Sequence, residues 1–155
     1  MPFRVITAQD IQQKLRDLQT SYYGFALVAD RADDRCRTVG TAIHAPQDWP
    51  KYAPMNQWVR LAHEEVHLVQ YNRYGTVGFL LRYLWPSWRW QLESEAFAVE
   101  MRAVVEAYGP DRLRKKRQEY IDTLSGGDYY WMRSRSAVTQ WVDQTIASLA
   151  VLIFS

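Results

Sequence analysis

From Met55 to the end of the chain, apolar residues recur at the three- and four-residue spacing of α-helices, and this pattern limits the fold more than any other feature. Glycine and proline interrupt it, most clearly at Gly75, at Pro86 and at the Gly109–Pro110 pair. The breaks predict helices over residues 56–74, 76–85, 88–108, 111–123 and 135–153. Most of the chain should therefore form a packed assembly of helices.

The N-terminal third has a different pattern. Thr7 is a candidate N-cap for a first helix over 8–19. Two short runs of strand character follow at 25–29 and 38–45, and the polar turn between them predicts an antiparallel hairpin. The expected fold class is α+β and mostly α, with a small N-terminal antiparallel sheet. Since no repeat or linker divides the sequence, residues 1–155 are expected to form one domain.

The composition of the chain limits which kinds of protein it can be. The chain of 155 residues is 48% hydrophobic with a formal net charge of +2, which predicts a folded protein and gives no indication of a nucleic-acid partner. Its single cysteine, Cys36, excludes an internal disulfide and favours a reducing compartment. The N-terminus lacks a signal-peptide pattern, and the apolar stretch at 146–155 is too short to span a bilayer. These features predict a cytoplasmic protein without a membrane span.

The sequence HEEVH at residues 63–67 is the strongest indication of chemistry. On a helix His63 and His67 lie on one face, where two imidazoles can bind one metal ion. Glu64 lies beside that face and can act as a general base. The alternative is a helix with two ordinary buried histidines. Burying both together with a carboxylate would be costly without a cation, so the pattern favours a metal site.

A third ligand is expected from the helix over 88–108, which offers three glutamates. Glu93 lies on the apolar stripe of that helix and is the predicted ligand. Glu100 also faces inward, two turns later, and is the candidate hydrogen-bond acceptor for a ligand histidine. Glu95 lies on the opposite, solvated face and is the alternative third ligand.

The HExxH sequence followed by E-x-E-A in a later helix resembles the gluzincin class of zinc metallopeptidases, in particular its minimal single-domain members from bacteria and phages. The similarity covers roughly residues 37–105. It implies a zincin-like domain that binds Zn²⁺ through His63, His67 and Glu93, with Glu64 as the catalytic base. Many members carry Asp or Asn where this chain has Phe97, so Glu100 would have to replace that hydrogen-bond acceptor.

The resemblance implies cleavage of a peptide or protein substrate, which the strand at 38–45 could bind along its edge. His44 in that strand is expected to be half-buried. A tyrosine hydroxyl is expected to donate a hydrogen bond to the oxyanion of the reaction. The sequence offers four candidates and does not decide between them: Tyr71, Tyr83, Tyr129 and Tyr130.

Two other functions compete with peptidase activity. The first is an inactive zinc-binding protein of the same fold. The second is an assembly or interaction protein that forms a homo-oligomer through the apolar C-terminal helix. The tryptophan-rich segment 83–91 is interpreted as an aromatic hinge in the core, with a cleft wall or lid as the alternative.

Overall fold

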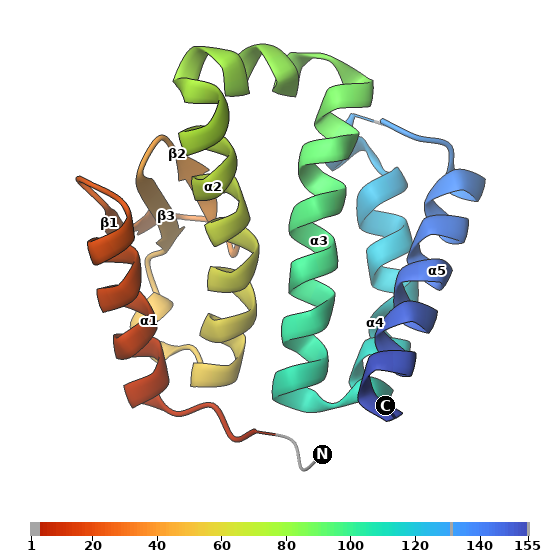
Figure 1. Cartoon of the computed structure of the whole chain (residues 1–155), viewed down its shortest axis with the longest axis horizontal. Helices are drawn as coiled ribbons and strands as arrows, with labels where there is room; N and C mark the ends of the chain where they lie inside the picture. The colour runs from red at the N-terminus through yellow and green to blue at the C-terminus, as the bar shows by residue number, and fades with distance from the viewer. Residues whose placement is uncertain (1–3, 131, 155) are drawn as a thin grey trace.

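The computed structural model describes residues 4–130 and 132–154, and it confirms an α+β fold that is mostly helical (Figure 1). The helices are α1 (Ala8–Ser21), α2 (Pro54–Leu84), α3 (Pro86–Tyr108), α4 (Pro110–Ser125) and α5 (Arg135–Phe154). The strands are β1 (Ala26–Arg31), β2 (Arg37–Val39) and β3 (Ala42–Pro46). Short 3₁₀ turns occupy Trp49–Lys51 and Gly127–Tyr129.

The sheet corrects one prediction. Its strand order is β1-β3-β2, with β1 parallel to β3 and β2 antiparallel to β3. The expected hairpin between residues 25–29 and 38–45 is therefore wrong, and the sheet is mixed. The segment 38–45 is itself a hairpin, because Gly40 adopts a positive φ of 62° and reverses the chain between β2 and β3. This turn puts β3 at the centre of the sheet and leaves β2 at one edge.

Helix α1 begins where the sequence predicts. The Thr7 side chain accepts a hydrogen bond from the Asp10 backbone N–H, and the Asp10 carboxylate accepts one from the Thr7 backbone N–H. Lys14 Nζ lies 2.6 Å from Glu65 Oε2 on α2, so an ion pair joins the two helices. Figure 1 shows α1 beside α2 on the side of the molecule that also carries the sheet.

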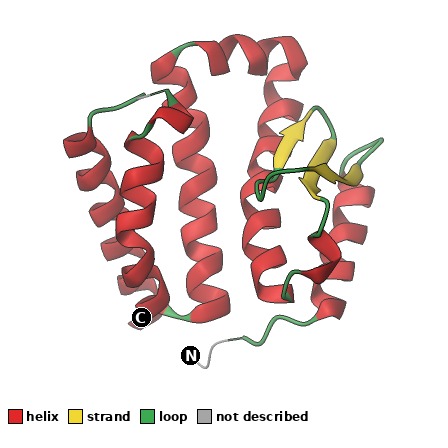
Figure 2. Cartoon of the chain, turned by 180° about the vertical axis from the view of Figure 1, so that it is seen from behind, coloured by secondary structure: helices red, strands yellow, loops and turns green. Residues whose placement is uncertain are grey.

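Helices α2 and α3 form the centre of the molecule and lie side by side in both views (Figures 1 and 2). Helix α2 is interrupted at Gly75, whose φ of 68° and ψ of 164° are not helical. The predicted break at this glycine is thus confirmed as a kink. Helices α4 and α5 cover the other side of α3. The largest fully buried apolar side chains come from all of these layers: Leu18, Ile43, Leu61, Leu68, Met101, Leu113, Ile121, Leu124, Val104 and Val138.

The tryptophan-rich segment is not the core hinge that the sequence suggested. Pro86 begins α3 directly after α2, and Trp85 and Trp88 are exposed at this junction. Only Trp90 turns inward, where its ring meets Trp141 of α5 with centroids 5.4 Å apart.

The apolar C-terminal helix is partly anchored in the core. Val138 and Val142 are fully buried, and Ile146 and Leu149 pack against the core. Side chains from residue 152 onward lie outside the described residues. The expected homo-oligomer through this helix stays a prediction. Within the described part of the chain, no helix has both the length and the apolar character needed to cross a membrane.

Candidate metal centre

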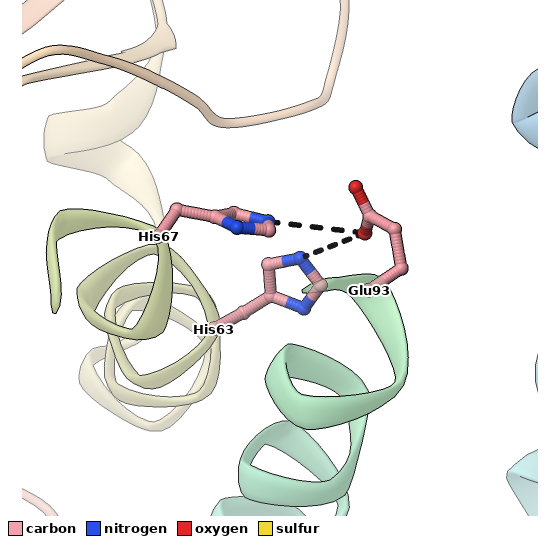
Figure 3. Close-up of side chains that lie close together, drawn as sticks. All are labelled: His63, His67 and Glu93. Carbon is pink, nitrogen blue, oxygen red and sulfur yellow. Dashed lines mark ion pairs between the residues drawn. The ribbon is translucent and has the colours of Figure 1, made fainter. Parts of the chain in front are cut away.

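Helices α2 and α3 bring the three predicted ligands together. Figure 3 shows His63 and His67 projecting from α2 toward Glu93 of α3. The Nε2 atoms of His63 and His67 each lie 3.8 Å from Glu93 Oε2. One ligand atom from each residue falls within 4.8 Å of the other two, so the group can hold a metal ion.

The buried carboxylate supports this interpretation. Glu93 is 2% exposed, and its Oε2 has no hydrogen-bond partner. An unpaired carboxylate oxygen in the interior is costly, and a cation between it and the two imidazoles would compensate. Two ligands bound at about 2.1 Å to one tetrahedral ion lie roughly 3.4 Å apart. The observed 3.8 Å separations are close to that value, so the residues fit a metal.

A chain of hydrogen bonds orients His67. Its Nδ1 lies 2.9 Å from Gln70 Oε1, and an N–H at Nδ1 leaves Nε2 free to face Glu93. The Gln70 amide in turn donates to the Leu92 carbonyl and to Glu95 Oε2, both at 3.0 Å. Glu95 is exposed and bonds to Gln70, so the structure brings Glu93, and not Glu95, to the histidines.

Glu100 contacts the other histidine, as predicted. Its Oε2 lies 2.9 Å from His63 Nδ1, and the Tyr120 hydroxyl donates to its Oε1 at 2.9 Å. Phe97, in the place where the resemblance expects Asp or Asn, packs edge-on against the His63 ring at 4.7 Å. The acceptor therefore comes from the next turn of α3.

The charges around His63 favour a cation. Burial lowers the pKa of His63, but Glu100, Glu64 and Glu93 outweigh burial and raise the pKa to about 9. Burial raises the pKa of Glu100, and its contacts with His63 and the Tyr120 hydroxyl reverse this and hold the pKa below its usual value. The interior at this point thus carries an excess of negative charge.

Strand β2 holds Glu64 in place. The Thr38 hydroxyl donates to Glu64 Oε2 at 2.7 Å and also lies 3.2 Å from the Glu64 carbonyl oxygen. Glu64 is buried at 5% exposure next to the ligand His63. Sequence reasoning missed both Thr38 and Gln70. The position of Gln70, three residues after His67 on the same helical face, was the available indication.

Two of the four candidate tyrosines lie beside the site. Burial, together with the Glu93 carboxylate, raises the pKa of Tyr83 and of Tyr129, so both phenols keep their protons. Tyr71 instead stacks on Phe79, with ring centroids 3.9 Å apart. Tyr130 is exposed and lies over the Arg89 guanidinium.

His44 does not reach the ligands. It is half-buried, as expected, and its Nδ1 lies 2.9 Å from Asp30 Oδ2 on the neighbouring strand. Its two neighbours in β3, Ile43 and Ala45, are buried, so His44 points to the opposite face of the sheet.

Comparison of the chain with protein-family models, with curated proteins and with solved structures finds no match. The site itself therefore carries the functional argument.

Proposed function

We propose that this chain is a zinc-dependent metallopeptidase domain of the gluzincin type. The observation that carries the proposal is the convergence of His63, His67 and Glu93, with an unpartnered Glu93 oxygen between the two imidazoles. Glu64 follows the first ligand in sequence and supplies the carboxylate that hydrolysis needs.

The donor set favours zinc over other common ions. Two imidazole nitrogens and one carboxylate oxygen are the ligands of many catalytic zinc sites, and the fourth position is left for water or substrate. Calcium and magnesium prefer oxygen ligands alone, and a structural zinc site would normally include cysteine thiolates. Cys36, the only cysteine, is not among the three grouped residues, and burial, with the nearby Glu64 charge, raises the pKa of its thiol to about 12.

A zinc ion held here would act as a Lewis acid that makes water a nucleophile near neutral pH. The carboxylate of Glu64 accepts a proton from the attacking water and passes it to the leaving amine. Thr38 fixes the position of that carboxylate through the 2.7 Å hydrogen bond. The hydroxyls of Tyr83 and Tyr129, which both sense the Glu93 charge and keep their protons, are the candidate donors for the oxyanion.

The sheet suggests how a peptide would bind. Because β3 is central, the edge open to an extended substrate near the site is that of β2, not of the whole segment 38–45. Thr38 lies in β2 and contacts Glu64, so a peptide paired with this edge would run past the proposed base.

Replacement of the base tests the proposal. Glu64→Gln should keep bound zinc and lower cleavage of a quenched-peptide library by about 10²–10⁴-fold. The matched control is Glu65→Gln, which alters the adjacent carboxylate that pairs with Lys14 and should retain activity. Full activity in Glu64→Gln would contradict the mechanism. Stoichiometric zinc without any cleavage by the wild type would instead support the inactive zinc-binding protein.

A further inference from the structure

The end of the molecule where α2 turns into α3 carries an unusual apolar surface. Six large apolar side chains there are between 47 and 72% exposed: Val77, Leu80, Leu81, Leu84, Trp85 and Trp88. We call this set the apolar tip. It forms part of the arch that joins α2 to α3 at the top of Figure 1.

The apolar tip has the spacing of a helix face that is normally buried. Residues 77, 80, 81 and 84 stand at i, i+3, i+4 and i+7, which places them in one stripe along the part of α2 after Gly75. The opposite side of the same segment holds the buried Phe79, which packs on Tyr71 and Tyr83. The segment therefore presents one apolar face to the core and a second one outward.

The charged residues of the segment that carries the apolar tip are all arginines. Residues 66–92 contain no aspartate or glutamate, and of their three arginines Arg73 is exposed, Arg82 is half-buried and Arg89 is buried. The Arg82 guanidinium lies 5.2 Å from the Trp88 ring centroid, directly beside the tip. Among the described residues, none of these arginines forms an ion pair with a carboxylate. The positive charge beside the apolar tip therefore comes from Arg73 and Arg82.

We infer that the apolar tip inserts into the surface of an anionic lipid membrane. Leucine and valine would enter the acyl boundary, the two tryptophans would occupy the headgroup level, and Arg73 and Arg82 would meet lipid phosphates. A second copy of the chain fits less well, because a two-fold contact would bring arginines against arginines with no acidic residue of the segment to pair them. The helical stripe is far too short to span the bilayer, so the contact is peripheral.

Sedimentation with vesicles tests this contact. We expect the wild type to pellet with vesicles of phosphatidylcholine and phosphatidylglycerol, less with phosphatidylcholine alone, and less at high salt. The double variant Leu81→Gln, Leu84→Gln should bind anionic vesicles at least about tenfold more weakly. Arg82→Gln should make binding to anionic vesicles less dependent on the salt concentration.

The matched control is Val99→Gln with Val151→Gln, two exposed valines on α3 and α5 outside the apolar tip. Binding equal to wild type in this control, with unchanged unfolding midpoints in all variants, would support the inference. A wild type that stays in the supernatant with anionic vesicles would overturn it. So would equal loss in control and tip variants, or a tip variant that only converts a dimer to a monomer. Vesicle binding should persist after treatment with a metal chelator, so its outcome is independent of the proposed peptidase activity.

Discussion

The two parts of α2 on either side of Gly75 differ in the polar side chains that they bury and in the apolar side chains that they expose. Before the glycine, the helix encloses His63, Glu64, His67 and Gln70 in the interior. After it, the helix exposes most of its large aliphatic side chains and buries Phe79. The first part buries polar side chains among its apolar ones, and the second part exposes apolar side chains on the surface. Each departure from simple packing marks a candidate function.

The largest expected effect concerns the buried polar part. Glu93→Ala removes the carboxylate between the two imidazoles, and zinc affinity should fall by more than the roughly hundredfold that loss of an outer hydrogen-bond partner causes. Metal analysis of purified protein and zinc titration measure this. The control is Glu106→Ala, an exposed glutamate near the end of α3 that pairs with Arg102, and this variant should keep stoichiometric zinc. Loss of zinc in Glu95→Ala alone would move the third ligand to that residue.

The same substitution on each side of Gly75 compares the two parts directly. Leu68 is 1% exposed and Leu81 is 58% exposed. Leu68→Ala should reduce the free energy of unfolding by about 2–5 kcal/mol, because it leaves a cavity in the core. Leu81→Ala should change it by less than about 0.5 kcal/mol. Denaturant unfolding measures both, and a large loss in Leu81→Ala would mean that the apolar tip is buried in solution.

The smallest effect concerns the junction itself. Gly75 has φ 68° and ψ 164°, a region open almost only to glycine, and no heavy atom would lie within 4 Å of an added Cβ. Gly75→Ala should therefore cost about 1–3 kcal/mol through backbone strain alone.

Gly78, in the helical part three residues later, is the matched control. An added Cβ there meets the Tyr74 Cβ at 3.4 Å, an ordinary contact. Gly78→Ala should stabilise the protein by about 0.5–1 kcal/mol, since alanine favours helix. Equal changes in the free energy of unfolding of Gly75→Ala and Gly78→Ala would contradict a non-helical backbone at Gly75.

The periodicity of the sequence was sufficient to predict the helices and the three candidate metal ligands. His63 and His67 are about one helical turn apart, so their side chains lie on the same face of α2. Glu93 lies on the apolar stripe of α3. Local helix geometry therefore determines where these side chains point. Glu100 follows from the same stripe, and the structure places it at His63.

Contacts between distant segments could not be derived in this way. The parallel pairing of β1 with β3 depends on the turn at Gly40, which short-range strand propensity does not distinguish from one longer strand. Thr38 reaches Glu64 across separate elements, and no spacing rule joins them. Exposure of Trp85 and Trp88 depends on how the chain turns at Pro86, whereas tryptophan itself suggests burial.

The hydrogen bond from Thr38 to Glu64 also has a consequence for the order of folding. All three ligands belong to α2 and α3, consecutive helices joined at Pro86, so closing that pair costs little loop entropy. The proposed base gains its orienting partner only when the sheet docks on α2. We therefore expect the helical pair to capture zinc early in folding, while competence for hydrolysis appears later, with the sheet. On the proposed function, a newly made chain would bind zinc before it could hydrolyse a peptide.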